Sequence, residues 1–147
     1  MKFWTFLQTV RHLSFSVKSK QRGGMTSKMG RAEVQIISSS PTVCIFQEMG
    51  YWLKDQMPET TFHSSFRWTL DTKATLITLE HLRYGASHPV FLFHLTPTKP
   101  FYLETVDAHL CVEDSYLGSI LWSSSTMHFH WRVLGPFKNE ELIYSYS

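Results

Sequence analysis

Hydrophobic and polar residues alternate in short runs along most of the chain from about residue 30 onward. In the clearest run, Phe62, Ser64, Phe66, Trp68 and Leu70 alternate with more polar neighbours. A period of two is typical of a β-strand with one buried face. Turn residues separate the runs, so the pattern predicts antiparallel strands joined by short connections.

The runs predict eight to ten short strands, at 30–37, 43–49, 62–70, 74–82, 90–95, 102–111, 116–122, 127–134 and 142–146. Only residues 2–13 predict a helix, because Phe3, Phe6, Leu7 and Val10 fall on one side of it. No 3.6-residue period links the strands, which argues against parallel βαβ architecture.

Many sequential strands in a small domain expose sheet edges, and closing the sheet into a barrel removes those edges. The predicted fold is therefore all-β, an antiparallel meander barrel of eight to ten strands with a short N-terminal helix. A half-open sheet wrapped on a helix is the alternative. Barrels of about eight strands or more can hold one small ligand.

Composition supports one globular domain spanning residues 1–147. Hydrophobic residues make up 43% and aromatic residues 15%, enough for a well-filled core, and 18% charged residues are too few for a disordered chain. No apolar run reaches the length of about eighteen residues that a membrane helix needs. We therefore expect no membrane partner; a monomer and a homodimer are both open.

Charge and cysteine content narrow the possible partners and the cellular compartment. A net charge of +2 is too small to indicate nucleic-acid binding. Two cysteines, Cys44 and Cys111, are fewer than a secreted domain usually carries, which favours reduced thiols in the cytoplasm, although one disulfide stays open. Residues 1–32 hold seven of the fourteen Lys and Arg and no acidic residue, so an organelle-targeting role is a second reading of that segment.

The tetrapeptide His128-Phe129-His130-Trp131 raises the question of zinc. Both histidines share a strand face, and the same tetrapeptide supplies two zinc ligands in the α-type carbonic anhydrases. A catalytic zinc needs a third protein ligand, and none of the residues after His130 is a histidine. We therefore predict no metal site, with Met127, Phe129, Trp131 and Val133 facing the core and His128, His130 and Arg132 facing the other side.

A second motif is His109-x-Cys111-x-x-Asp114-x-Tyr116. His109 and Cys111 share a strand face, residues 112–115 predict a turn, and Tyr116 begins the returning strand, which we expect to place it beside Cys111. A cysteine beside a histidine can form a thiolate nucleophile, with an aspartate to orient the imidazole. The plainer interpretation is a half-buried cysteine, a hydrogen-bonded histidine, a turn aspartate and a packing tyrosine.

This motif carries a resemblance to a known family. Together with residues 131–139, which read Trp-Arg-Val-Leu-Gly-Pro-Phe-Lys-Asn, and a terminal Tyr144-Ser145-Tyr146, it resembles the domain of unknown function 6314. Weaker matches are Phe93-His94, the strand with Phe66-Arg67-Trp68, Gly30-x-Ala32-x-Val34 and Phe6-Leu7. The resemblance implies a lipocalin-like or calycin-like barrel and no established activity, and it makes the basic N-terminus part of the domain.

One departure from the family pattern concerns the base of the barrel. Members open with a Phe-Leu-Gly-x-Trp-like turn whose tryptophan plugs the base, whereas this chain has Phe6-Leu7-Gln8-Thr9-Val10. Trp4 is the candidate replacement for that plug.

Three hypotheses follow. The leading one is a non-enzymatic module that binds a small apolar or planar ligand in the barrel. Its candidate binding residues are His109, Cys111, Asp114, Tyr116, His94, Arg67, Trp131 and Lys138, with Arg132 as a further polar group near the cavity.

Within this hypothesis Lys138 is a rim cation beside a Gly135-Pro136 turn, and an anionic ligand group could meet Arg67 or Lys138. The cofactor is unknown; haem would need one axial histidine, His94 or His109. The alternatives are an enzyme that uses His109, Cys111, Asp114 and Tyr116, and a solid-cored interaction protein.

Overall fold

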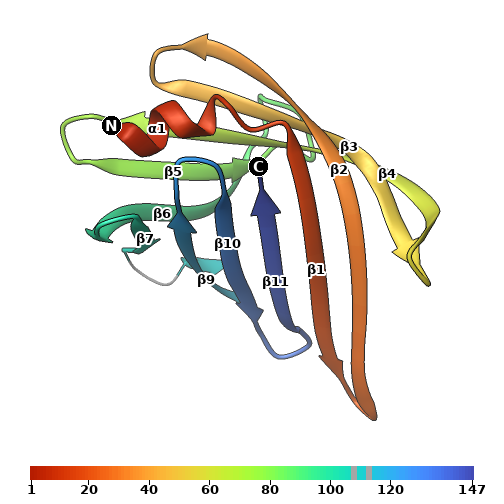
Figure 1. Cartoon of the computed structure of the whole chain (residues 1–147). Coiled ribbons are helices and arrows are strands. Elements are labelled where there is room, and N and C mark those ends of the chain that lie inside the picture. The colour runs from red at the N-terminus through yellow and green to blue at the C-terminus, as the bar shows by residue number, and fades with distance from the viewer. Residues whose placement is uncertain (107–108, 112–113) are drawn as a thin grey trace.

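The computed structural model describes residues 1–106, 109–111 and 114–147, with the side chains of Ser39 and of residues 109–111 left aside. Figure 1 shows one short helix and a strongly curved sheet. The elements are α1 (Lys2–Leu7), β1 (His12–Gln21), β2 (Gly24–Ser40), β3 (Val43–Lys54), β4 (Met57–Asp71), β5 (Leu76–His81), β6 (Val90–Lys99), β7 (Tyr102–Thr105), β8 (His109–Cys111), β9 (Asp114–Trp122), β10 (Met127–Leu134) and β11 (Asn139–Tyr146).

Ten strands close into one antiparallel barrel. The neighbours run in the order β10, β11, β1 to β7 and β9, and β9 pairs with β10 to complete the circle. Short β8 pairs only with β9 and adds a flap beyond the end of β7. Because each strand follows its neighbour along the chain, the prediction of an antiparallel meander barrel with a short N-terminal helix is confirmed.

The N-terminal helix is shorter than its hydrophobic pattern predicted. It ends at Leu7, where the Thr9 hydroxyl donates a hydrogen bond to the carbonyl of Phe6 and starts a turn. The helical prediction is therefore wrong for residues 8–13. Residues 12–21 instead alternate as Leu13, Phe15 and polar neighbours, and they form β1 between β11 and β2.

This strand changes how the basic N-terminus is interpreted. Lys18 and Lys20 are exposed residues of β1, and Arg31 is an exposed residue of β2. Both strands are integral to the barrel wall, so these cations project from a folded sheet.

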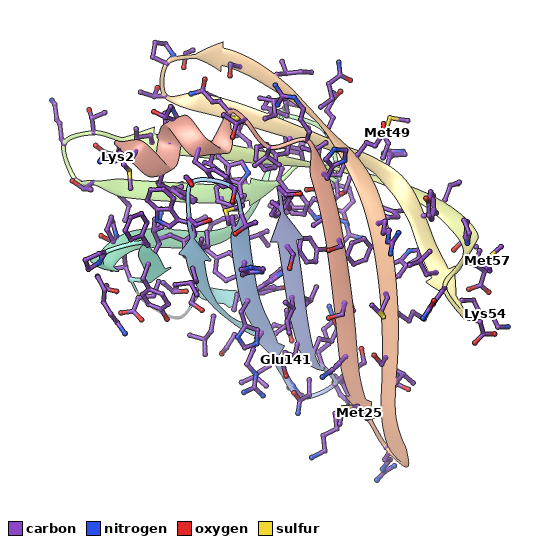
Figure 2. All side chains as sticks on the ribbon, in the orientation of Figure 1. Lys2, Met25, Met49, Lys54, Met57 and Glu141 are labelled. Carbon is purple, nitrogen blue, oxygen red and sulfur yellow. The ribbon has the colours of Figure 1, made fainter. Side chains whose placement is uncertain are left out.

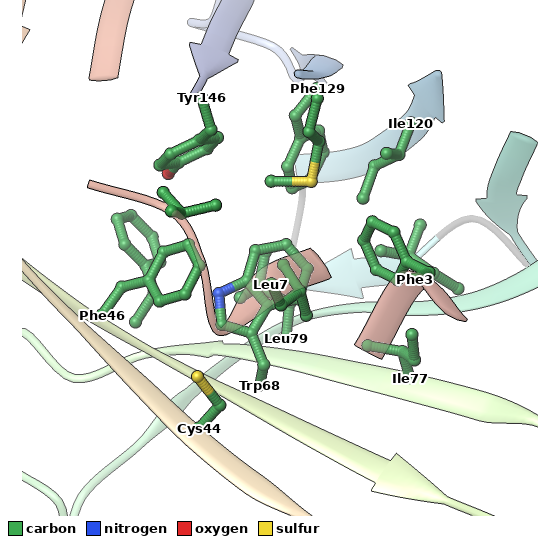
Figure 3. Packing of buried hydrophobic residues seen from close by; sticks show 14 of the residues in the cluster. Phe3, Leu7, Cys44, Phe46, Trp68, Ile77, Leu79, Ile120, Phe129 and Tyr146 are labelled. Carbon is green, nitrogen blue, oxygen red and sulfur yellow. The ribbon is translucent and has the colours of Figure 1, made fainter. Parts of the chain in front are cut away.

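The helix closes one end of the barrel. Its Phe3, Trp4, Phe6 and Leu7 are all buried, and the Trp4 indole donates a 2.8 Å hydrogen bond to the carbonyl of Pro41 in the β2–β3 turn. Trp4 thus forms a plug at this end, as expected of the replacement for the missing family tryptophan. Figure 3 shows Leu7 of α1 and Trp68 of β4 among the side chains of the same buried cluster.

The core lies inside the barrel and against α1. Its members are mostly inward-facing strand residues that alternate with exposed ones, as in Met127, Phe129 and Val133 on β10. The strand predictions from residue 30 onward match the observed elements except at 102–111, where the structure has two short strands, β7 and β8, in place of one. Strands β2, β3 and β4 also extend well beyond the predicted limits. In the described part of the chain, no helix is long and apolar enough to cross a membrane.

Candidate functional site

A layer of aromatic side chains faces inward toward the barrel end opposite α1, which we call the open end. This aromatic layer comprises Phe15, Trp52, Phe62, Phe93, Tyr116, Trp131 and Tyr144. The rings contact one another around the wall: Tyr144 lies 5.7 Å from Trp131 and 5.3 Å from Phe15, centroid to centroid. Phe15 lies in turn 5.0 Å from Trp52.

Exposure distinguishes five members of this layer from the core, whereas its other two members, Phe15 and Phe93, are buried. Trp52, Phe62, Tyr116, Trp131 and Tyr144 are half-buried, whereas inward residues nearer α1, such as Phe46, Trp68, Phe129 and Tyr146, are almost fully buried. The strand register gives the reason. Trp52, Phe62, Tyr116 and Trp131 lie on the parts of their strands that are farther from α1, and α1 covers the opposite end.

Glycines shape the wall behind the layer. The Phe15 ring packs directly on Gly30, in space that any side chain on residue 30 would occupy. At Gly50 an added Cβ would overlap the Arg31 carbonyl, so β2 and β3 approach more closely there than a side chain allows. These glycines let the long strands bend and leave inward positions free for aromatic rings.

The side chain of Glu48 lies buried among these apolar groups, with only 1% of its surface exposed. Its Oε2 accepts a 2.6 Å hydrogen bond from the Tyr146 hydroxyl, and its Oε1 accepts a 3.0 Å hydrogen bond from the Ser64 hydroxyl. Three strands, β3, β4 and β11, therefore meet at one carboxyl group. No ion pair to Glu48 is present among the residues that the structure describes.

Burial dominates the ionisation of this group. Desolvation raises the pKa of Glu48 to about 7, although the hydrogen bonds from Tyr146 and Ser64 oppose the rise. The same burial and the nearby Glu48 charge raise the pKa of Tyr144 above its ordinary value, and Tyr146 behaves in the same way. Both phenols are neutral hydrogen-bond donors at physiological pH, and Glu48 titrates near it.

An unsatisfied donor lies in the aromatic layer. The Trp131 Nε1–H is buried and has no hydrogen-bond partner within the described part of the chain. The Trp68 Nε1–H has the same status deeper in the core, where Trp68 is 1% exposed. Because an unpaired buried donor costs free energy, a ligand acceptor at Trp131 would be favourable.

Two predicted binding residues lie on the outer face of the barrel. The Arg67 Nε donates a 2.9 Å hydrogen bond to Glu80, and this ion pair occupies the guanidinium. His94 lies between buried Phe93 and Leu95, is exposed itself, and shares a 3.0 Å hydrogen bond with Thr78. The structure therefore separates both side chains from the barrel interior, where they were expected to line a cavity.

The two histidines of the His128-Phe129-His130-Trp131 segment also face outward. His128 shares a hydrogen bond with Ser145 and His130 with Glu141, each 3.0 Å long. Trp131 and the buried side chains of β10 face inward, and Arg132 is exposed, so the predicted facing of this strand is confirmed. Within the described residues, no group of three or more His, Cys, Asp or Glu side chains is placed to hold a metal ion.

The cluster predicted at residues 109–116 is resolved in part. In backbone register Tyr116 lies opposite His109, and Asp114 lies opposite Cys111, so Tyr116 is two pairs away from its expected place beside Cys111. The side chains of His109 and Cys111 lie outside what the structure describes. Asp114 lies 3.8 Å from the Lys138 ammonium, which joins β9 to the predicted Gly135–Pro136 turn at the open end.

The outer wall carries two adjoining hollows. These hollows, of about 510 and 700 Å³, lie over β11, β1, β2 and β3 and share Ser14, Arg31 and Ser145. Exposed Met25, Met29 and Met49 belong to the same strands, and Figure 2 shows Met49 projecting away from the barrel. This wall is a second surface of interest, chemically distinct from the interior.

Sequence reasoning missed Glu48 and most of the aromatic layer. Glu48 stands between Gln47 and Met49 in a run of mixed polarity, so nothing local marks it as buried. The available signal was its place in the alternation along the strand, because Cys44, Phe46 and Glu48 fall on one face of β3. A charged residue on the same strand face as buried hydrophobic residues is a candidate interior group.

Comparison with known proteins places the chain in a family. The model of a family of unknown function, DUF6314, matches residues 4–147. The chain belongs to DUF6314. No curated protein matches this DUF6314 member. It is similar to the solved structure described as "Structure of EF1p2_mFAP2b bound to DFHBI", at 9% identity and a TM-score of 0.41, with 91% of this chain and 90% of that chain covered.

Proposed function

We propose that this DUF6314 member is a lipocalin-like barrel that binds a small apolar or planar molecule at its open end. The supporting observation is the contrast between the two ends of the barrel. Helix α1 seals one end, while five inward-facing aromatic side chains remain half-exposed toward the other. Partly exposed aromatic rings on the inner face of a barrel favour an apolar ligand, and flat rings favour a planar one.

The polar groups of the layer give the ligand an orientation. The unpaired Trp131 Nε1–H would donate to a ligand acceptor, and Tyr144 and Phe15 would contact its faces. Lys138 and Asp114 form a charged pair at the rim, where they can contact a ligand as it enters.

Native mass spectrometry of the protein from a rich expression host, followed by denaturing extraction, tests this function. A stoichiometric small molecule is expected, with lower occupancy in Trp131→Phe, which removes only the indole donor and part of the ring. Trp122→Phe is the matched control, because Trp122 packs on Phe3 and Phe6 at the α1 end. A bare polypeptide mass that does not shift on addition of haem, fatty acids or small aromatic probes would overturn the proposal.

A second candidate function is protein interaction through the outer wall. It is supported by the two adjoining hollows over β11, β1, β2 and β3 and by the exposed methionines beside them. Methionine side chains adapt to varied partners. Loss of a partner in Met29→Ser and Met49→Ser, with ligand occupancy unchanged, would favour this candidate.

We also propose a cytoplasmic location. Cys44 is a free, fully buried thiol, which fits the low cysteine content and a reducing compartment. Fluorescence microscopy of the tagged full chain in its own host checks this placement.

A further inference from the structure

The interior of the barrel holds a carboxyl group without a cation. Glu48 is buried, and both of its oxygens accept hydrogen bonds from neutral hydroxyls, those of Ser64 and Tyr146. The ion pairs of the described residues all lie elsewhere: Arg67 with Glu80, His130 with Glu141, and Lys138 with Asp114. Burying a carboxylate with no opposite charge is costly, so a group that supplies the missing charge would be bound strongly.

Aromatic rings lie on the open-end side of this carboxyl group. Tyr144 is close enough for the Glu48 charge to raise its pKa, and its ring lies tilted against that of Tyr146, with 6.1 Å between centroids. Tyr144 in turn contacts Phe15 and Trp131. The faces of aromatic rings carry negative electrostatic potential and attract cations, most strongly in Trp and Tyr.

Small residues lie between the carboxyl group and the open end. The next inward position after Glu48 on β3 is Gly50, which pairs with Ala32 on β2, and the one after it, Trp52, pairs with Gly30. On the other side Ser64 of β4 lies opposite Glu48, and Phe62 lies opposite Gly50. The inward positions next to Glu48 toward the open end are therefore small, and the rings of Phe15, Trp52 and Phe62 contact one another beyond them.

We propose that the ligand of the barrel is an organic monocation, such as an aromatic or alkylated amine, whose positive group lies beside Glu48 and against the faces of the aromatic layer. This inference rests on the proposed binding function and specifies the class of ligand. The sequence predicted that an anionic group of the ligand could meet Arg67 or Lys138, whereas the ligand proposed here is cationic. The reason is that Arg67 is ion-paired on the outer face, and the buried interior group is the carboxylate of Glu48.

The surroundings of Glu48 define how pH affects such binding. The titratable groups that face it are Tyr146 and Tyr144 from β11, and both stay neutral through pH 8 because burial raises their pKa values. From β4 it meets Ser64, and from β2 its register partner is Val34. Lys28 of β2 is exposed and lies over the Trp52 ring, 5.8 Å from its centroid. Among the residues that the structure describes around this site, Glu48 is therefore the group that changes charge between pH 5 and pH 8.

A pair of probes with one shape and different charge tests the proposal. Trimethylanilinium carries a quaternary cation, and tert-butylbenzene is its neutral isostere. Binding of each to the full chain is measured at pH 8 and pH 5.5 by the shifts of tryptophan indole resonances. Glu48→Gln keeps both hydrogen bonds possible and removes the charge, and Glu33→Gln removes an exposed carboxylate from neighbouring β2 as the matched control.

The expected result is a preference of about tenfold for the cation at pH 8. That preference should be lost at pH 5.5 and in Glu48→Gln, and retained in Glu33→Gln. Equal affinity for the two probes would overturn the cation assignment and leave the binding function standing. No binding of either probe, with a folded spectrum, would count against both. Should Glu48→Gln fail to fold, the pH dependence of the wild-type preference decides the question.

Discussion

The Tyr146 hydroxyl donates a 2.6 Å hydrogen bond to the carboxylate of Glu48, and the two residues are 98 positions apart in the chain. Tyr146 ends the last strand, and Glu48 lies in the middle of β3, so the bond crosses the barrel interior. Figure 3 shows Tyr146 near Phe46, the preceding inward residue of β3. This contact links β11, the final strand, to Glu48, the buried acid of the barrel interior.

The raised pKa of Glu48 makes stability depend on pH. In the unfolded chain the carboxyl titrates near 4.5, and in the folded protein near 7, so between these values the folded state holds the extra proton. The free energy of unfolding should therefore fall by about 3 kcal/mol as pH rises from 4.5 to 7, and this contribution should level off above 7.

Urea unfolding of the wild type and Glu48→Gln across pH 4.5–8 measures this contribution. The difference in slope between the two proteins isolates Glu48, since the other titrating groups are shared. Parallel curves would show that Glu48 ionises normally in the folded state.

Removal of the Tyr146 hydroxyl should lower the free energy of unfolding more when Glu48 is ionised than when it is neutral. Tyr146→Phe is expected to cost about 2 kcal/mol at pH 8, where the bond goes to a carboxylate, and about 1 kcal/mol at pH 5, where the carboxyl is neutral. It should also raise the pKa of Glu48 further, because that hydrogen bond lowers it. Tyr51→Phe, at a residue 37% exposed, is the control for loss of a phenol. An equal cost at both pH values would contradict this account.

Gly50 should tolerate no side chain. An added Cβ would overlap the backbone carbonyl of Arg31, which cannot move without breaking the β2–β3 pairing. At Gly118 the nearest atoms belong instead to the rings of Phe129 and Phe93, at 3.0 and 3.1 Å, and side chains can shift by a few tenths of an ångström. We expect Gly50→Ala to cost about 3 kcal/mol or more and Gly118→Ala about 1 kcal/mol. Equal losses in thermal unfolding would refute the distinction.

The Cys44 thiol should be inert until the barrel opens. It is fully buried, and desolvation raises its pKa to about 11, so the reactive thiolate is scarce. In a Cys111→Ser background, alkylation of Cys44 by iodoacetamide should follow the rate of unfolding and accelerate in urea. Fast labelling under native conditions would mean that the β2–β3–β4 wall opens locally.

The histidines of the HFHW segment should not confer zinc affinity. His128 and His130 lie on the outer face and are hydrogen-bonded to Ser145 and Glu141. Titration of zinc into the wild type and into a double His128→Ala, His130→Ala variant should give the same heat and no difference in thermal stability. Zinc bound stoichiometrically by the wild type and lost in the variant would restore the metal hypothesis.

The sequence by itself determined the class of fold. Alternation in runs such as 127–134 requires one face of each strand to be buried, and short connections between successive runs require antiparallel neighbours. These are local properties, so they survive without knowledge of the partner strand. The same reasoning placed Trp131 inward and His128 and His130 outward, as the structure confirms.

The tertiary structure decided where the helix ends and which polar groups are buried. Residues 8–13 satisfy a helical pattern, yet β11 and β2 offer His12 and Leu13 a complete set of strand partners. Glu48 is buried because Tyr146, at the far end of the chain, supplies a donor to it. The alternation of Glu48 with Cys44 and Phe46 could mark it as an interior candidate. Neighbours in sequence carry no information about contacts that closure of the barrel creates, so only the ten paired strands show which groups hydrogen-bond to this acid.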